Sequence, residues 1–276
     1  MTPPAMRALL GDYPVTRLFK EKAGLQFADV ELPHTAFKRV VRDLEFDVAE
    51  LALVTFLLAR THGKPLRLLP AVLTARFQHA MLVFDSSKGT LSPRELEGRR
   101  VGQRSYSVTT ATWVRGILAE DYGVDLDKVR WVTFEEPHVA EVRDPPNAER
   151  APAGKDMAAM LLAGELDAAI VGEPPEDPRL KTVIPHPAAA AQAWCKRTGA
   201  SIQINHMVAV KSSVPPELSG QIYRQLLESR AAACDRQAHE FGIEQNRRNL
   251  EAAIDCVYRQ GMIPRRCAVE ELFEDR

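Results

Sequence analysis

The sequence predicts an α/β protein of two lobes, in which each lobe is a mostly parallel sheet flanked by helices. The chain has 276 residues, of which 45% are hydrophobic, so it exceeds the usual size of one domain and can bury two cores. Short apolar runs alternate with amphipathic stretches in the first third, as expected for β/α units on a parallel sheet. A second series of the same design begins after Ser86.

The apolar pattern assigns the elements of both series. The first series is expected to hold strands at 7–11, 26–32, 46–50 and 66–73 and helices at 16–22, 35–43 and 54–62. The second is expected to hold strands at 99–102, 129–134 and 166–171 and helices at 108–122 and 156–163. Gly123 is a natural stop for the helix at 108–122, because glycine readily adopts the left-handed conformation found after helix ends.

Two short segments of similar pattern end the two series. Residues 79–87 and 206–213 each begin with a histidine, continue as an apolar β run and end with a charge and a Ser-Ser pair. We interpret them as two crossover strands that link the lobes, with their histidines beside the cleft. Helical patterns after Pro215 return the chain over the first lobe. The predicted boundaries are 1–83 and 210–276 for the first lobe and 84–209 for the second.

Composition and charge exclude several classes of partner. Lys plus Arg number 36 and Asp plus Glu number 37, so no overall field attracts nucleic acid or an anionic membrane. The longest apolar runs are too short to span a bilayer. Four cysteines without a CxxC pair indicate neither a metal cage nor a disulfide framework. The amino terminus lacks the pattern of a secretory signal, so we expect a cytoplasmic protein, or a periplasmic one if the true start lies upstream.

His79 and His206 are the candidates for proton transfer, because imidazole is the side chain that changes charge near neutral pH. A lone histidine at a strand edge is more often structural, but two at corresponding crossover positions favour a functional role. Glu50 interrupts an otherwise apolar strand, and a buried carboxylate there needs a partner. Four acids, Asp12, Glu50, Glu135 and Glu136, are candidates for orienting a histidine, contacting ligand hydroxyls or holding a divalent ion.

Arg17, Arg76 and Arg115 are the candidates for binding a carboxylate, because a guanidinium makes a two-point contact that lysine cannot make. Arg76 lies just before the first crossover strand and is the preferred candidate. Arg17 follows the first strand, where parallel α/β folds place ligand groups. Arg115 lies on the helix at 108–122, where it either contacts a ligand or is solvated.

The start of the same helix offers hydroxyl and backbone N–H groups. Ser107, Thr109 and Thr110 suit an anion at a helix amino end, and they equally suit a plain helix cap. Trp113 either stacks on an aromatic ligand or packs in the core. The run at 135–138, Glu-Glu-Pro-His, has metal-ligand residue types without the spacing of a metal site.

Short motifs along nearly the whole chain are similar to those of one known family. They are Gly11-Asp12-Tyr13 with Thr16-Arg17, 46–50, 76–79, 100–102, 109–116, 135–137, 163–168, 197–199, Asn205-His206 and 271–273. Their order and number resemble the 4,5-dihydroxyphthalate decarboxylase family, which has the type II periplasmic-binding-protein fold of ABC-type solute-binding proteins. Residues 171–176 are acidic where the family tends to carry small residues and an arginine.

The resemblance implies a carboxy-lyase that removes one carboxylate from a hydroxylated aromatic diacid, such as 4,5-dihydroxyphthalate, in an interlobe cleft. Arg76 and the helix start would anchor the substrate, and His79 or His206 would transfer the proton. No organic cofactor is implied, and the need for a divalent metal stays open, as does a homo-oligomeric state. The alternative is a non-catalytic solute-binding protein that uses the same cleft for a small organic acid.

Overall fold

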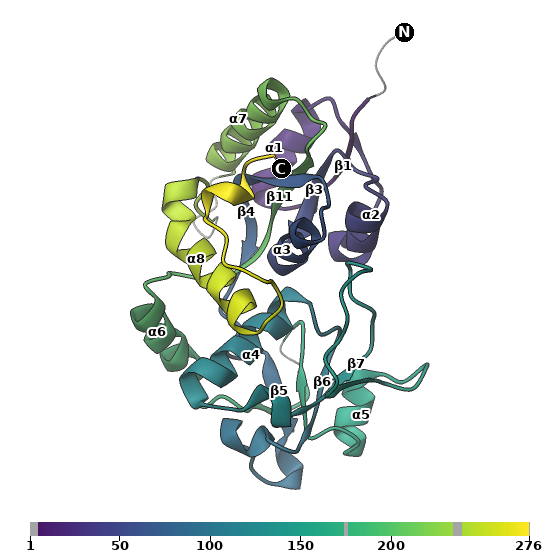
Figure 1. Cartoon of the computed structure of the whole chain (residues 1–276), viewed down its shortest axis with the longest axis vertical. Helices are drawn as coiled ribbons and strands as arrows, with labels where there is room; N and C mark the ends of the chain where they lie inside the picture. The colour runs from purple at the N-terminus through teal and green to yellow at the C-terminus, as the bar shows by residue number, and fades with distance from the viewer. Residues whose placement is uncertain (1–4, 174–175, 234–238, 276) are drawn as a thin grey trace.

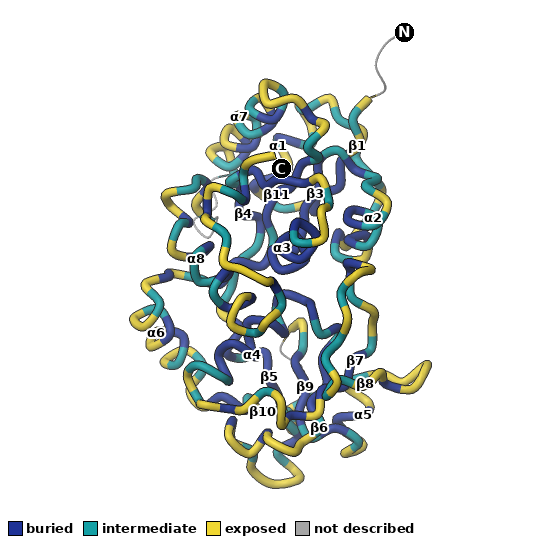
Figure 2. Tube along the Cα trace, in the orientation of Figure 1, coloured by how far each residue is buried: buried dark blue, intermediate teal, exposed yellow. Residues whose placement is uncertain are grey.

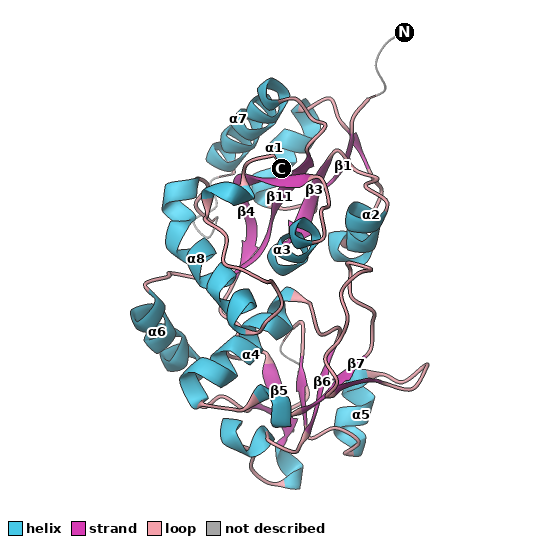
Figure 3. Cartoon of the chain, viewed as in Figure 1, coloured by secondary structure: helices cyan, strands magenta, loops and turns pink. Residues whose placement is uncertain are grey.

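The computed structural model describes residues 5–173, 176–233 and 239–275, and it has two lobes, one above the other in Figure 1. Each lobe contains one sheet with helices packed against it, as Figure 3 shows. The predicted two-lobed α/β architecture is therefore confirmed. We call the lobe of the five-stranded sheet the first lobe and that of the six-stranded sheet the second lobe.

The first sheet has the strand order β2-β1-β3-β11-β4. Its strands are β1 (Arg7–Leu9), β2 (Gln26–Phe27), β3 (Val48–Ala52), β4 (Leu66–Ala75) and β11 (Ile204–Lys211). Strand β1 is parallel to β2 and β3, whereas β11 runs antiparallel between β3 and β4. The helices of this part of the chain are α1 (Pro14–Lys22), α2 (Phe37–Arg42), α3 (Leu53–Thr61), α7 (Pro216–Ala232) and α8 (Ile243–Arg259).

The second sheet has the order β10-β5-β9-β6-β7-β8. Its strands are β5 (Leu82–Asp85), β6 (Arg100–Gln103), β7 (Arg130–Thr133), β8 (Ala148–Arg150), β9 (Ala168–Ile170) and β10 (Leu180–Thr182). Strands β9, β6, β7 and β8 are parallel, and β5 and β10 complete the sheet in antiparallel pairs. The helices here are α4 (Thr109–Tyr122), α5 (Met157–Ala163) and α6 (Pro187–Thr198).

Short 3-10 turns complete the secondary structure. They are η1 (Pro33–Ala36), η2 (Ser86–Lys88), η3 (Pro93–Leu96), η4 (Leu126–Lys128) and η5 (Glu270–Leu272). The turn η3 is held by the side chains of Ser92 and Glu95, which bond reciprocally at its amino end.

Local sequence explains where several helices begin and end. Helix α4 ends at Gly123, whose φ of 65° is the left-handed conformation that the sequence predicted there. Helix α5 begins after Asp156, whose carboxylate accepts a hydrogen bond from the Ala159 amide at 2.8 Å. Both termini are therefore set by single residues that satisfy free backbone groups or remove strain.

Buried residues concentrate along both sheets and the helices against them, as the dark tube in Figure 2 shows. Every residue of β3 is buried, and α3 is buried from Leu53 to Arg60. A helix that is apolar on all sides needs cover on all sides. Helix α3 has it, because α4, α8 and the first sheet all contact it.

The chain crosses between the lobes twice, after β4 and before β11. The two crossing segments are bonded to each other: the Arg76 amide donates to the Gln203 carbonyl at 3.0 Å, and the Gln78 amide donates to the Gln203 side chain at 2.7 Å. Each predicted crossover segment does contain a strand, β5 in the second sheet and β11 in the first. The predicted lobe boundaries at 83/84 and 209/210 stay a prediction.

His79 is packed inside the first crossing segment. It is 1% exposed and lies edge to face against Phe77 and Trp194, with ring centroids 6.2 and 6.4 Å away. Neither ring nitrogen has a hydrogen-bond partner among the described residues. Burial accordingly lowers the pKa of His79 from 6.5 to about 4.

This buried histidine should make stability depend on pH. Between pH 6.5 and about 4 the unfolded chain binds a proton at His79 that the folded chain excludes, so stability falls as the pH falls. The difference between the pKa of the unfolded chain, 6.5, and that of the folded chain, about 4, corresponds to about 3 kcal/mol of unfolding free energy. Urea unfolding at pH 7 and pH 4.5 should therefore show a smaller loss for His79→Leu than for the unchanged protein.

The matched control is His62→Leu, because His62 is exposed. It should leave the pH dependence as it is in the unchanged protein. Every variant will still lose some stability between pH 7 and pH 4.5, because burial also lowers the pKa of His138, to about 3. An equal loss in the His79 variant and the unchanged protein would contradict the assignment.

Candidate functional site

A cavity of about 710 Å³ lies between the facing edges of the two sheets. From the first lobe it is lined by the ends of β3 and β4 and by the start of β11, at Ala52, Thr74 and His206. From the second lobe come residues that follow β7 and β9, such as Glu135 and Val171, and the first turn of α4. The cavity therefore lies where the parallel strands of both sheets end, the position at which α/β folds bind ligands.

Glu50 and His206 meet at the first-lobe side of this cavity. The two residues are on neighbouring strands, β3 and β11, and the Glu50 Oε1 atom is 2.6 Å from His206 Nδ1. The Glu50 side chain is fully buried, while the His206 side chain is 21% exposed and lines the cavity. Because Nδ1 faces the carboxylate, Nε2 is the ring nitrogen that is available to a ligand.

Two further groups donate hydrogen bonds to Glu50. The Tyr13 hydroxyl donates to Oε1 at 2.8 Å, and the Gly11 amide donates to Oε2 at 3.0 Å. Burial and the adjacent carboxylate raise the pKa of the Tyr13 hydroxyl, which keeps it protonated as a donor. A Cβ atom at Gly11 would lie 2.6 Å from the Tyr13 ring, so only glycine leaves room for this arrangement.

The strand that carries His206 is irregular at that position. The register of β11 against β4 shifts on both sides of His206, which is the kind of irregularity that re-aims a side chain next to a site. The ring is also held by Phe37, which packs edge to face with a centroid distance of 5.2 Å. These contacts fix the imidazole before any ligand enters.

Two other histidines, His34 and His138, line the same cavity. Burial, with the charge of Arg104, lowers the pKa of both, to about 3 for His138. His138 lies 2.8 Å from the Thr55 hydroxyl, and its backbone carbonyl accepts a hydrogen bond from Arg42 of α2 at 2.9 Å. The loop after β7 is thereby fastened to the first lobe and carries a neutral imidazole into the cavity.

Three cations line the cavity, and each has an acidic partner. Arg76 donates to the Glu173 carboxylate at 2.6 Å and also to the Gly172 carbonyl. Arg104 is 3.7 Å from the Glu135 carboxylate. Lys155 lies 2.8 Å from Glu165. An incoming anion must therefore compete with these acids or share the cation with them.

The start of α4 contributes Thr109 and Thr110 to the cavity. The Thr109 hydroxyl accepts a hydrogen bond from the Val54 amide at 3.2 Å, so it caps α3 from the opposite lobe. The Asn205 side chain donates to the Thr110 hydroxyl at 3.5 Å. Ser107 is buried but does not line the cavity, and Val108 rather than Ser107 precedes the helix.

Other predicted site residues lie outside the cavity lining. Arg115 is fully buried over the Tyr106 ring, and Trp113 donates to the Ile204 carbonyl at 3.0 Å. His79 is enclosed in the first crossing segment. Asp12 and Arg17 form an exposed pair 3.6 Å apart. The ligand roles expected for these residues stay predictions.

The sequence alone did not single out His34, Arg104, Lys155 or Asn205 as site residues. His34 lies in a 3-10 turn, and Arg104 and Lys155 lie in connecting segments next to strand or helix ends. The available signal was positional, because polar residues that follow parallel strands gather at one edge of a sheet. Of the acidic stretch at 173–177, Pro174 and Pro175 lie outside the described residues.

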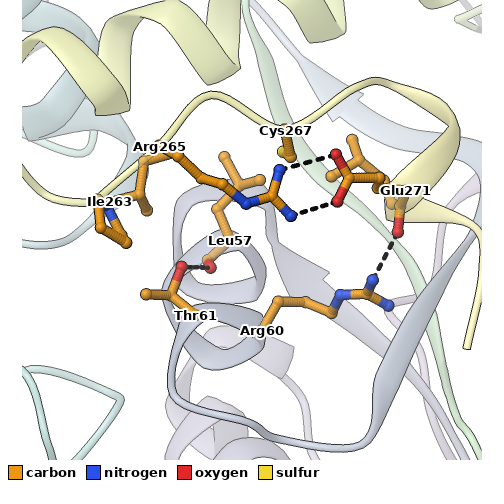
Figure 4. Close-up of a pocket in the computed structure, with 9 residues that line it drawn as sticks. Leu57, Arg60, Thr61, Ile263, Arg265, Cys267 and Glu271 are labelled. Carbon is orange, nitrogen blue, oxygen red and sulfur yellow. Dashed lines mark hydrogen bonds and ion pairs between the residues drawn. The ribbon is translucent and has the colours of Figure 1, made fainter. Parts of the chain in front are cut away.

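A second cavity, of about 320 Å³, lies between α3 and the carboxy-terminal segment (Figure 4). Its arginines are bound within the chain: Arg265 pairs with the Glu271 carboxylate at 2.9 Å, and Arg60 donates to the Glu271 carbonyl at 2.6 Å. The charges that line this cavity thus tie the last turn of the chain to α3. We assign it no ligand.

Two general features bear on partners. Within residues 5–173, 176–233 and 239–275, no group of three or more His, Cys, Asp or Glu side chains is arranged to hold a metal ion. Among the helices that the structure describes, none has the length and apolar character needed to cross a bilayer.

Two solved structures of SsuA binding proteins have a similar fold. The alkanesulfonate-binding protein SsuA from Xanthomonas axonopodis pv. citri, bound to MOPS, aligns with a TM-score of 0.54 at 14% identity, over 99% of this chain and 98% of that one. The sulphonate-binding protein SsuA from Escherichia coli aligns with the same TM-score at 11% identity, also over 99% and 98%. The predicted binding-protein fold is therefore confirmed.

No family model matches the chain, but two curated proteins do. A 4,5-dihydroxyphthalate decarboxylase from Comamonas testosteroni is 28% identical over 220 residues, which are 74% of this chain and 66% of that protein, just under two thirds of its length. One from Pseudomonas putida is 30% identical over 175 residues, 59% of this chain and 68% of that protein. The chain belongs to the 4,5-dihydroxyphthalate decarboxylase family.

Proposed function

We propose that this protein is a carboxy-lyase that removes one carboxylate from a small hydroxylated aromatic acid of the 4,5-dihydroxyphthalate kind. The observation that carries the proposal is the buried Glu50 carboxylate bonded to His206 at the edge of the 710 Å³ cavity. The family relationship to two curated decarboxylases supports it. The cavity is of the size in which proteins commonly enclose small ligands.

The Glu50–His206 pair provides a positioned general acid. The carboxylate at 2.6 Å fixes the orientation of the imidazole, so that Nε2 is directed away from Glu50. The other cavity histidines do not carry the extra proton that this step needs, because burial lowers the pKa of His138 and His34 and keeps them neutral. His206 therefore takes the role that the sequence left open between His79 and His206.

The reaction needs one proton and releases one carbon dioxide molecule. A ring hydroxyl para to the departing carboxylate supplies electron density, and the acid protonates the ring carbon that bears this carboxylate. The C–C bond then breaks, its electron pair returns to the ring, and carbon dioxide leaves. His206 recovers a proton from solvent. The chain's own residues thus bind the substrate, orient it and deliver the proton.

Substrate anchoring falls to Arg76 and to the start of α4, which line the same cavity. Arg76 offers a guanidinium that can hold a carboxylate by two hydrogen bonds. The first turn of α4, with Thr109 and Thr110, adds hydroxyl groups and a helix amino end that favours negative charge. This arrangement holds one carboxylate on the cationic side and leaves the reacting carbon to face His206.

A second candidate is binding without catalysis, for delivery or sensing of a small organic acid. It is favoured by one observation, the fold shared with the sulphonate-binding proteins. Both candidates use the same anion-holding side of the cavity. They differ only in whether the Glu50–His206 pair transfers a proton, because function resides in the site rather than in the fold.

The first test is carbon dioxide release from a panel of hydroxylated phthalates and benzoates, with and without added divalent metal. Turnover of a dihydroxyphthalate is expected, and a thermal shift without release would instead establish the binding protein. His206→Gln should lower release at least 100-fold, the scale of a lost general acid. His79→Leu should retain release within a few fold, and the reverse pattern would overturn the assignment.

A second test concerns the charge of Glu50. Glu50→Gln keeps the size of the side chain but removes the carboxylate that bonds His206 Nδ1 at 2.6 Å. We expect turnover to fall at least tenfold while the thermal shift given by a saturating aromatic acid is retained. Circular dichroism verifies the fold of the variant. Equal loss of turnover and of binding would mean that Glu50 serves only to hold the first lobe together.

A further inference from the structure

A close ion pair on the cavity wall joins the two lobes. Arg76 follows β4 of the first sheet, and Glu173 lies beyond β9 of the second. The Arg76 guanidinium donates to the Glu173 carboxylate at 2.6 Å and to the Gly172 carbonyl. Both side chains line the cavity and both reach solvent, with 37% of Arg76 and 81% of Glu173 exposed. The pair therefore lies at the solvent side of the cavity.

The other two cations of the cavity are placed differently. Lys155 is paired with Glu165, which does not line the cavity. Arg104 has a cavity acid, Glu135, but at the looser distance of 3.7 Å. Among the described residues, Arg76 is thus the cavity cation that pairs closely with a carboxylate which itself lines the cavity.

We propose that Glu173 is an internal competitor for the carboxylate site on Arg76, so that a ligand binds by displacing it. The inference rests on the proposed function, because it takes Arg76 as the anchor of the substrate carboxylate. Glu173 then contributes to specificity, because a ligand's carboxylate must bind Arg76 more favourably than the Glu173 carboxylate does. A neutral analogue of the same shape gains nothing from this exchange.

The physical cost of the exchange is small. An ion pair between exposed side chains contributes little, because water and salt screen it. The Glu173 carboxylate is already largely hydrated, so its release into solvent removes few contacts. After turnover the same carboxylate is close by and can return to Arg76. Glu173 therefore lowers the affinity for substrate and product alike and speeds the departure of the product.

The test measures binding of phthalate, which has two carboxylates but no ring hydroxyl to activate decarboxylation. Isothermal titration would be carried out on the unchanged protein, Glu173→Gln, Arg76→Gln and the double variant. Glu173→Gln should bind phthalate about two- to fivefold more tightly, the range that an exposed ion pair supports. The gain should disappear in the Arg76→Gln background, since the cation competed for is then absent.

Two controls isolate the pair. Glu176→Gln removes an acidic side chain three positions further along, which is exposed and does not line the cavity, so phthalate affinity should stay within about 1.5-fold by the additivity of distant sites. The uncharged phthalamide should bind the unchanged protein and Glu173→Gln equally well. Circular dichroism verifies that all variants are folded.

The outcomes separate this inference from the proposed function. If Arg76→Gln weakens phthalate binding but Glu173→Gln has no effect, the anchor stands and the competitor is rejected. If Glu173→Gln tightens binding equally with and without Arg76, the effect is a general charge effect and the competitor is again rejected. If Arg76→Gln leaves phthalate affinity unchanged, or if no form binds phthalate, both the anchor and the competitor fail.

Discussion

The structure around the site depends on one buried charge. The Glu50 carboxylate is fully buried in the middle of β3, and a buried charge is costly unless hydrogen bonds compensate for it. The Gly11 amide, the Tyr13 hydroxyl and the His206 ring surround it. These groups come from the connection after β1, the start of α1 and the strand β11. Satisfying Glu50 therefore fixes three distant parts of the chain relative to each other.

The long elements of the fold were predictable because their signals are local. The helix at 108–122 and its stop at Gly123 follow from periodicity and from the backbone freedom of glycine, and α4 has nearly these bounds. Helix α6 was not predicted. Only Ala191 and Trp194 are buried along it, so its apolar face is too narrow to give a clear helical period. Strands β8 and β10 were not predicted either. They have three residues each and lie at the sheet edges, where partial burial gives no clear apolar run.

The candidate site was predictable in part, for a reason that the residues make clear. Glu50 stood out because a carboxylate in an apolar strand requires a partner, and His206 stood out at a strand start; the structure brings the two together. Trp113 was a candidate because its ring can stack on an aromatic ligand, and Arg115 because a guanidinium can bind a carboxylate at two points. Helix α4 is buried on several sides, so periodicity alone does not tell which side faces the cavity.

In the proposed function, proton donation and carboxylate binding belong to different parts of the cavity wall. The proposed proton donor, His206, is held by the first lobe alone, through Glu50 and the packing of Phe37 against its ring. The cations that would hold a carboxylate lie on a crossing segment and in the second lobe, at Arg76 and Arg104. In the proposed reaction, the distance between the anchored carboxylate and His206 is set by how the two lobes approach each other. The bonds that join the two crossing segments, and the tie from Arg42 to the loop that carries His138, then act on catalysis by limiting that approach.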